Sequence, residues 1–546
     1  MRHTALLLLL VPVGLAAQTL PEDLASLEGQ VFDAATGGTV RKAAVALRPV
    51  DARTTPGFNG YGTSTDDSGK FGMKDIVPGR YRLTVSHTGY VNGEYGSRGP
   101  GRPGATLSLD RAQNLTGLAV KLTPQGVVTG RIVDRDGDPV SGAWVQLLRY
   151  RYQQGQKQLQ ASDIGITNDL GEYRIFGVAP GRYYVGATYQ RNMLLNQTVD
   201  RSANAPPAED YVPVYYPGTT DVSTAMDLPV TPGSQVRADL ILDKTRTSRI
   251  TGRVVNAIGD LLPAATVSLT PRGSAGGPLY NKSATTGRDG TFELRGIAPG
   301  AYYLRAFVDQ AGKPHTARTP VEVGGTDIED LTLTAGPGVE VNGHVRIDGE
   351  STVRLTGIRV TLPSREPFAG VTSSAGVQED GTFRIEQVNH DVYNLSFPGL
   401  PPGFYVKSIK SGDTDLLAAG LDLTSGAPGD LDVVLSPNAG QVTGLVQDAQ
   451  SQPVAGATVV LIPQDQERRE QQRDYRVATT DQAGGFNLTS VVPGDYRVYA
   501  WEDVESGAYF DPEFMKPVES RGEKISLHEK DQVILQLAVI PADANR

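Results

Sequence analysis

The sequence predicts an all-β protein, built as a tandem array of five β-sandwich modules that follow a signal peptide. Three observations predict this class: a strand-turn-strand motif recurs five times, apolar and polar residues alternate within it, and no strong helical pattern competes. The composition agrees, because 63 glycines and 36 prolines in 546 residues supply many turns without reaching the level of a low-complexity chain.

The recurring motif is clearest at residues 290–304. Phe292 and Leu294 alternate with polar residues, and Tyr302 and Leu304 do the same, so each pair fits a strand with one buried face. A Pro-Gly pair separates the two strands. Proline presets φ for the second position of a tight turn, and glycine supplies the positive φ that a type II turn needs next. We therefore expect a β-hairpin.

Five copies of this motif are spaced by roughly 90 to 120 residues, which suits a row of β-sandwiches better than a solenoid. The copies are anchored at Gly69, Gly171, Gly290, Gly381 and Gly484. The fourth copy has His390 and Asp391 where the others have Pro-Gly. We expect it to form the least regular module.

A second repeated block precedes each motif and begins with a glycine, at Gly29, Gly130, Gly252, Gly343 and Gly444. Alternation within this block and an apolar closing strand after the motif give each module about six or seven strands. The predicted modules are residues 25–124, 125–245, 246–335, 336–437 and 438–546. The links between them are short and contain proline, so we expect a semi-stiff rod.

The N-terminus predicts export. Residues 1–17 combine a basic start, a short apolar run and small residues, which is typical of a signal peptide cleaved after Ala16 or Ala17. The apolar run is shorter than the ~20 residues of a membrane-spanning helix, and no second long apolar segment follows. We expect a mature chain without a transmembrane anchor, located in the periplasm, outside the cell or at the cell surface.

Charge and cysteine content exclude several classes of function. The formal net charge is −10, and an acidic surface repels phosphate backbones, which argues against nucleic acid as a partner. The chain has no cysteine, so it has neither disulfides nor a thiol nucleophile. Its modules must be held together by their cores.

The two repeated blocks resemble the carboxypeptidase regulatory-like domain, a β-sandwich of transthyretin-like or immunoglobulin-like form. In the second module the matching residues are the start at Gly130, Ile132 and Asp134, and the block from Pro139 to Val145. The motif from Gly-x-Phe or Gly-x-Tyr through Pro-Gly-x-Tyr completes the match. The resemblance covers five copies, the fourth being divergent. It implies a scaffolding and interaction role, with no catalytic residues to transfer.

The motifs of enzyme chemistry are missing from the sequence. Its six histidines are scattered, without the spacing of a zinc peptidase, and neither a nucleophile elbow nor a phosphate-binding loop occurs. The run 134–138 resembles a calcium loop, but it lacks the glycine and glutamate that an EF-hand requires. A turn favoured by Asp and Gly explains the run better. We predict neither catalytic residues, metal ligands nor a cofactor.

Aromatic residues that alternate with core positions are the best candidates for binding. Parity places them on the outer face of their sheets, where aromatic rings stack on sugars or anchor a partner protein. The candidates are Trp144, Tyr303, Phe307, Tyr499 and Trp501. The alternative is that loops or a neighbouring module cover these rings.

The sequence therefore favours a non-catalytic, exported scaffold or binding protein of the cell envelope, with an envelope protein or a polysaccharide as its partner. One alternative is a carbohydrate-binding protein that uses the outward aromatics. The other is an accessory subunit of an envelope transporter or enzyme.

Overall fold

The computed structural model describes residues 23–50, 60–153, 156–189, 209–272, 282–310, 313–365, 372–424, 426 and 429–542. The predicted signal peptide lies outside these residues. The chain is 56% strand and 7% helix, which confirms the all-β class. The described residues form five main hydrophobic clusters, each confined to one of the five predicted modules. The module boundaries themselves remain a prediction.

The first module packs two sheets against each other. One sheet has the order β4-β1-β9-β6, and the other has the order β3-β2-β5-β7 with β8 also paired to β5. The closing strand β9 runs parallel to the first strand β1, while β1 and β4 are antiparallel. The strands are β1 (Ala25–Asp33), β2 (Ala44–Pro49), β3 (Tyr61–Ser64), β4 (Lys70–Ile76), β5 (Gly79–Ser86), β6 (Tyr90–Val91), β7 (Gly93–Glu94), β8 (Leu107–Leu109) and β9 (Asn114–Pro124).

The second module repeats this plan, with sheets β13-β10-β18 and β12-β11-β14-β16, and with β19 and β17 added at their sides. A separate pair, β15 and β20, leads toward the third module. The elements are β10 (Gly126–Val133), β11 (Trp144–Gln153), β12 (Gln156–Ile166), β13 (Glu172–Val178), β14 (Gly181–Thr188), β15 (Glu209–Tyr211), β16 (Val214–Tyr215), the 3₁₀ helix η2 (Val222–Thr224), β17 (Leu228–Val230), β18 (Gln235–Arg237), β19 (Leu240–Ile241) and β20 (Lys244–Arg246).

The third module has sheets β24-β21-β27 and β23-β22-β25-β26-β28. Its long strands β25 and β26 form a regular antiparallel pair that ends at Gln310 and Lys313. The strands are β21 (Ser248–Val255), β22 (Thr266–Pro271), β23 (Lys282–Thr285), β24 (Thr291–Ile297), β25 (Gly300–Gln310), β26 (Lys313–Val323), β27 (Ile328–Thr334) and β28 (Gly336–Pro337).

The fourth module is the least regular, as the loss of its Pro-Gly pair predicts. Its main sheet has the order β32-β29-β37-β34-β35, and the rest is divided between the two-stranded sheets β30-β31 and β33-β36. The elements are β29 (Val339–Ile347), η4 (Leu355–Gly357), β30 (Arg359–Leu362), β31 (Ser373–Gly376), β32 (Thr382–Val388), β33 (Val392–Tyr393), β34 (Tyr405–Ser411), β35 (Thr414–Asp415), α1 (Leu416–Ala419), β36 (Leu421–Asp422) and β37 (Leu431–Ser436).

The fifth module has sheets β41-β38-β44 and β40-β39-β42-β43, and it carries short helices between their strands. The elements are β38 (Gly440–Gln447), β39 (Thr458–Pro463), α2 (Gln466–Arg469), η5 (Gln472–Asp474), β40 (Arg476–Thr479), β41 (Gly485–Val491), β42 (Gly494–Trp501), η6 (Ala508–Phe510), α3 (Pro512–Met515), η7 (Lys516–Arg521), β43 (Glu523–Leu527) and β44 (Gln532–Ala538).

The recurring motif is a corner between two sheets, and the expected β-hairpin is wrong. In the third module β24 pairs with β21, whereas β25 pairs with β22 and β26, so the Pro-Gly pair carries the chain from one sheet to the other. Gly300 begins β25 with φ +159, far from the value that a type II turn requires at this position. Alternation had located the buried faces correctly but could not identify each strand's partner.

Two other features shape this corner in every copy. A left-handed residue lies six positions after the anchoring glycine, where the strand register shifts at a β-bulge; these residues are Asp75, Gly177, Gly296, Gln387 and Ser490. A tyrosine hydroxyl then donates to the carbonyl oxygen four residues earlier, at 2.6 to 3.0 Å, from Tyr81, Tyr183, Tyr302, Tyr393 and Tyr496. The tyrosine that recurs in all five copies of the motif therefore stabilises the corner.

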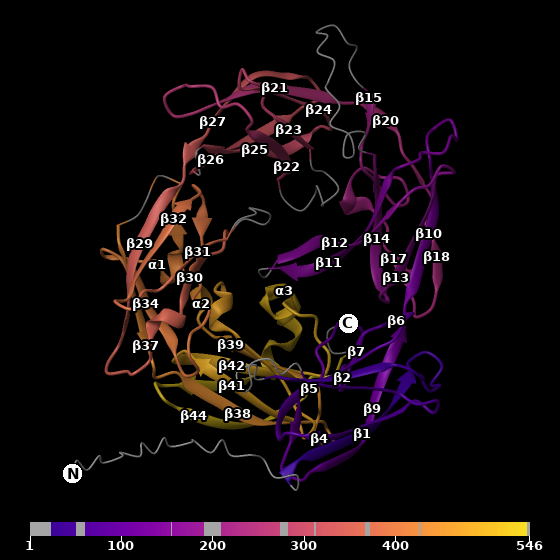
Figure 1. Cartoon of the computed structure of the whole chain (residues 1–546), viewed down its shortest axis with the longest axis vertical. Coiled ribbons are helices and arrows are strands. Elements are labelled where there is room, and N and C mark those ends of the chain that lie inside the picture. Colours follow the sequence, from indigo (N-terminus) through magenta and orange to yellow (C-terminus); the bar gives the residue numbers. More distant parts are fainter. Residues whose placement is uncertain are drawn as a thin grey trace, which may run out of the picture.

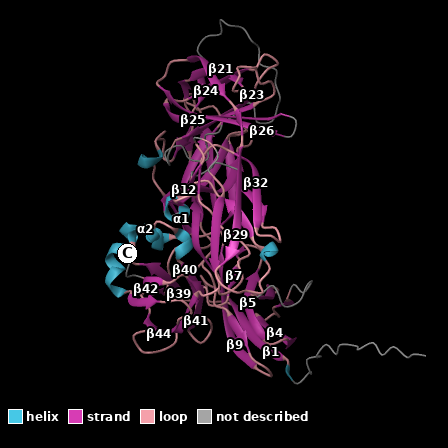
Figure 2. Ribbon diagram, turned by 90° about the vertical axis from the view of Figure 1, so that its left-hand side faces the viewer, coloured by secondary structure: helices cyan, strands magenta, loops and turns pink. Residues whose placement is uncertain are grey.

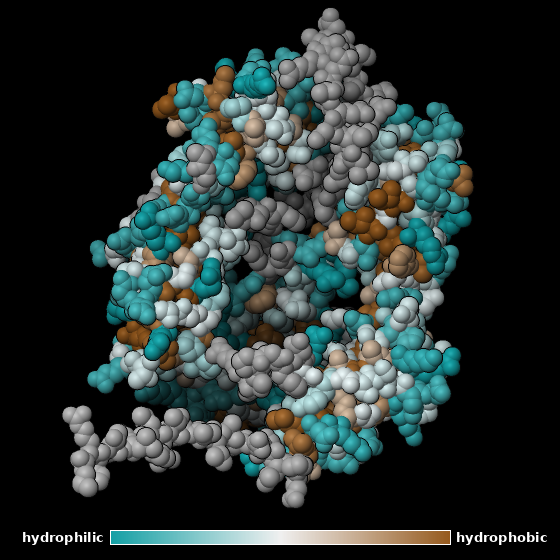
Figure 3. All heavy atoms as spheres, in the orientation of Figure 1, coloured by the Kyte–Doolittle hydropathy of each residue, from teal (hydrophilic) through white to brown (hydrophobic). Residues whose placement is uncertain are grey.

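The modules follow one another around a ring, and the expected rod is wrong. Figure 1 shows the first module, in indigo, beside the fifth module, in yellow, and Figure 2 shows the same two modules adjacent when the molecule is turned by 90°. Side chains join them, because the guanidinium group of Arg102 lies 2.8 Å from a carboxylate oxygen of Asp503. Figure 3, drawn in the orientation of Figure 1, shows a hollow near the centre of the ring. Short links restrict neighbouring modules but leave open the direction in which the array curves.

Candidate functional site

The third module presents two of the candidate aromatics on the outer face of β25. Tyr302, Leu304 and Ala306 are buried, so Tyr303 and Phe307 point away from the core as parity predicts. Phe307 is 50% exposed. Tyr303 is half-buried, because the Arg318 guanidinium lies 3.9 Å from the centre of its ring. Phe307 is therefore accessible to a ligand, whereas Tyr303 is largely covered by an arginine.

Trp144 lies in an apolar patch on the outer face of the second module. It is opposite Ile166 in the β11–β12 pair, and Gln146 is opposite Ile164. The two isoleucines are 53% and 51% exposed, and Trp144 is half-buried. Aromatic and branched apolar side chains therefore share one accessible surface here.

Tyr499 and Trp501 point away from the sandwich core, but they are not on the surface. Tyr499 is 2% exposed and Trp501 is fully buried. Their rings stack with centroids 5.2 Å apart, and the segment 502–521 covers them with Tyr509 and Val518. The expectation that these two rings are open to a ligand is wrong, because the chain after β42 folds back and forms a second small core on them.

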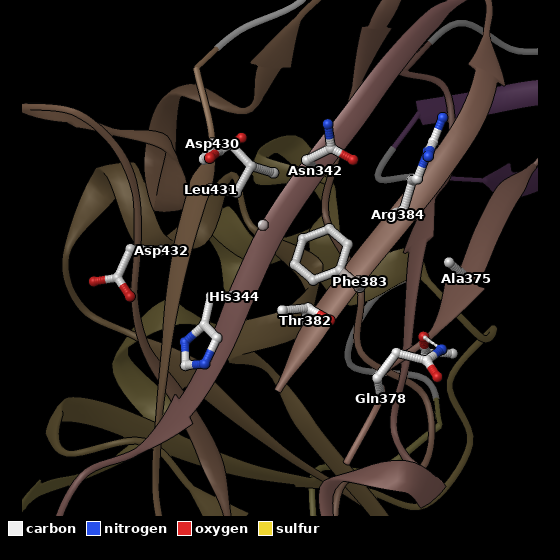
Figure 4. A pocket seen from close by; sticks show the side chains of 12 residues that line it. Asn342, His344, Ala375, Gln378, Thr382, Phe383, Arg384, Asp430, Leu431 and Asp432 are labelled. Atoms are coloured by element: carbon white, nitrogen blue, oxygen red, sulfur yellow. Dashed lines mark hydrogen bonds between the residues drawn. The ribbon is translucent and has the colours of Figure 1, made fainter. Parts of the chain in front are cut away.

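The fourth module holds an open pocket of 690 Å³ that the sequence did not predict. Figure 4 shows its lining, with Asn342 and His344 from β29, and Thr382, Phe383 and Arg384 from β32. The Phe383 ring forms an apolar floor, and polar groups surround it. A smaller pocket of 430 Å³ lies at the equivalent place in the second module, beside Gly130 and Tyr173.

Several polar groups of the larger pocket already have partners. His344 Nε2 lies 2.9 Å from the carbonyl oxygen of Asp380, and the Arg346 guanidinium lies 3.3 Å from Asp432. Arg384 pairs with Glu340 at 2.5 Å. The pocket can offer hydrogen bonds to a small polar molecule, but the charges of Arg384 and Asp432 are paired within the module. The glycine and aromatic positions recur in all copies, whereas His344 and Arg384 do not, so no repeated signal identified them.

The run 134–138 forms a turn, as its Asp and Gly content predicts. The Asp134 carboxylate accepts hydrogen bonds from the backbone N–H groups of Asp136 and Asp138, both at 3.0 Å. Gly137 has φ +87, which a side chain would make unfavourable. The first carboxylate of the run is therefore used to hold the backbone.

The arrangement of strands defines a protein made of β-sandwich modules, and sequence comparison finds a family match in three of them. Residues 26–122, 249–334 and 441–507 match the family model of the carboxypeptidase regulatory-like domain. These three regions lie in the first, third and fifth modules, and the expected resemblance is confirmed there. The second and fourth modules lie outside the matched ranges.

Solved structures resemble the chain only distantly. A streptococcal ancillary pilin is 15% identical, with a TM-score of 0.19, over 58% of this chain and 99% of the pilin. The TIE protein of Bacillus anthracis is 12% identical, with a TM-score of 0.16, over 77% of this chain and 76% of that protein. The minor pilin of Streptococcus agalactiae is 13% identical, with a TM-score of 0.22, over 40% and 96%.

No protein of curated description matches the sequence. Among the residues that the structure describes, no helix has both the length and the apolar character needed to cross a membrane.

Proposed function

We propose that this protein is a non-catalytic scaffold of the cell envelope, exported by its N-terminal segment, which presents binding surfaces on separate modules. The observation that carries this proposal is that some of the outward aromatics are buried within their module, whereas others are exposed. Tyr499 and Trp501 are used to build the module itself, whereas Phe307 and the patch around Trp144 stay accessible on separate modules. A scaffold needs stably folded modules and exposed aromatic residues that can anchor a partner.

Photo-cross-linking in the cells that produce the protein tests this role. The variants Trp144→benzoylphenylalanine and Phe307→benzoylphenylalanine place a reactive group on each accessible surface. Ile534→benzoylphenylalanine is the matched control, because Ile534 is 82% exposed on β44, in a sheet that contains neither Trp144 nor Phe307. We expect one or both test positions, and not the control, to capture an envelope component. Equal capture from all three positions, or from none, would contradict the proposal.

Carbohydrate binding is the second candidate, because Trp144 and Phe307 present rings of the kind that stack on sugar faces. Purified protein would bind an envelope polysaccharide, and Trp144→Ala or Phe307→Ala would weaken that binding at least tenfold, while Ile534→Ala would not. The absence of binding to a broad glycan array and to envelope polysaccharides would count against this candidate. Capture of a single protein by the cross-linker would instead favour an accessory role beside a transporter or enzyme.

A further inference from the structure

The first and fifth modules meet through charged side chains that come from insertions. Arg98 and Arg102 lie in the segment between β7 and β8, and Glu502 and Asp503 directly follow β42. Arg98 is 3.3 Å from Glu502, and Arg102 is 2.8 Å from Asp503. All four side chains are between 29% and 40% exposed, so solvent ions reach these pairs and screen them.

Backbone groups at the edge of the first module complete this contact. The Gln482 side-chain amide donates to the Ser108 carbonyl oxygen at 2.8 Å and accepts from the Ser108 N–H at 3.0 Å. Thr106 and Asp481 form an isolated parallel bridge beside it. Residue 482 therefore occupies the open edge of the three-residue strand β8, and the two groups are 374 positions apart in sequence.

An arm from the second module reaches the same region. The strand β11, which carries Tyr152, has 10 residues, whereas the equivalent strands β2, β22 and β39 have six and β30 has four. The extra length brings Tyr152 to the segment 502–521, where its ring packs on the small core around Trp501. Its hydroxyl donates to Asp511 at 3.2 Å. Burial, with the nearby Asp511 carboxylate, raises the pKa of Tyr152 to about 12, which keeps this donor protonated.

These contacts differ from those between consecutive modules, which are also joined covalently. Only one residue separates β9 from β10, for example. The contact of the fifth module with the first has no covalent link, and its two ion pairs are partly exposed. We propose that the ring is the closed state of a two-state chain, and that the ion pairs of Arg98 and Arg102 form a latch that opens it into an extended array. This inference concerns shape alone and stands apart from any ligand.

Small-angle X-ray scattering of the full chain without its signal peptide tests the latch. We expect Arg98→Glu with Arg102→Glu to raise the maximum dimension by roughly half or more, because five modules of ~100 residues in a row are much longer than the ring. Adding Glu502→Arg and Asp503→Arg restores complementary charge and should restore the closed dimension. The control is Arg82→Glu, which breaks a 3.2 Å pair with similar exposure inside the first module.

Three results would overturn the proposal. The wild-type chain could scatter as an extended array at low salt, the double variant could scatter like the wild type, or the fourfold variant could stay extended. Unchanged thermal unfolding of the modules would show that each variant is folded, since all four residues are partly exposed.

A disulfide provides a second measurement in a chain that has no cysteine of its own. Thr106→Cys with Asp481→Cys places two thiols at bridged positions, within reach of a disulfide. We expect oxidation to yield a closed monomer, at least tenfold more slowly when Arg98→Glu and Arg102→Glu are also present. Equal rates in the two backgrounds, or covalent dimers in place of closed monomers, would contradict the latch.

Discussion

Replacing Gly252 with alanine should destabilise the third module strongly, because the repeated glycine lies against a neighbouring strand. A Cβ at this position would lie 2.0 Å from the Leu331 carbonyl oxygen and 2.9 Å from the Phe292 ring. Cβ contacts under 3.0 Å are essentially never seen, so the paired strands β21 and β27 would have to separate by about 1 Å.

The expected loss of stability follows from the packing and the backbone hydrogen bonds that this shift disturbs. Overpacking costs about 1–3 kcal/mol, and a weakened backbone hydrogen bond adds about 1 kcal/mol, so we expect a loss of about 2–4 kcal/mol. For a module of this size the midpoint of its transition would fall by on the order of 10–30 °C. Gly324→Ala is the matched control in the same module, because no atom lies within 4 Å of its added Cβ. It should change stability by no more than about 0.5 kcal/mol.

Differential scanning calorimetry of the full chain would measure the transition, and hydrogen exchange of the peptide 248–255 would assign it to the third module. A multi-module chain need not unfold in one step, so the local exchange rate is the decisive quantity. If Gly252→Ala and Gly324→Ala unfold alike, the close approach of the strand is not what requires glycine.

Three further predictions concern the tyrosine hydrogen bond at the corner, the buried Trp501, and the contact of Glu529 with Lys407. Tyr302→Phe removes the hydroxyl that donates to Ala298 at 2.9 Å and should cost about 1 kcal/mol, measured as a lower midpoint in urea; an unchanged midpoint would show that the corner does not need this bond. Trp501→Ala should cost about 3–5 kcal/mol and expose the segment 502–521 to limited proteolysis, while persistent protection would contradict its role as the centre of that small core. Hydrogen bonds, together with Lys407, hold the pKa of Glu529 below its ordinary value of 4.5. The contribution of Glu529 to the free energy of unfolding should therefore be complete above pH 4.5 and lost as pH falls through the lowered pKa. Glu529→Gln should flatten the dependence of the unfolding free energy on pH in this range.

Alternation of side chains was sufficient to predict the buried faces. Phe292, Leu294, Tyr302 and Leu304 are all at most 4% exposed, as their spacing indicates. The same alternation cannot say which strands pair, because a corner and a hairpin place the same residues inward. This is why the sequence suggested a hairpin at Pro299, where the structure has a change of sheet.

The candidate site was predictable only in part, because exposure depends on segments distant from the residue itself. Parity correctly placed Trp501 away from the core of its sandwich, yet the following 20 residues cover it. Phe307 has the same parity on a strand without such a cover and stays half exposed. Likewise, the pairing of Arg102 with Asp503 joins residues about 400 positions apart and leaves no periodic signal.

The wide sequence separation at the ring junction also sets the order in which the molecule is completed. Tyr152 and Asp511 are 359 residues apart, so their contact forms only after the last module has been synthesised and folded. Until then the edge of β8 at Ser108 lacks Gln482 and is open to strands from other chains. The edge is only three residues long, and Pro103 lies nearby, which limits such pairing. The brevity of β8 thus protects the nascent chain during the interval before the C-terminal module arrives.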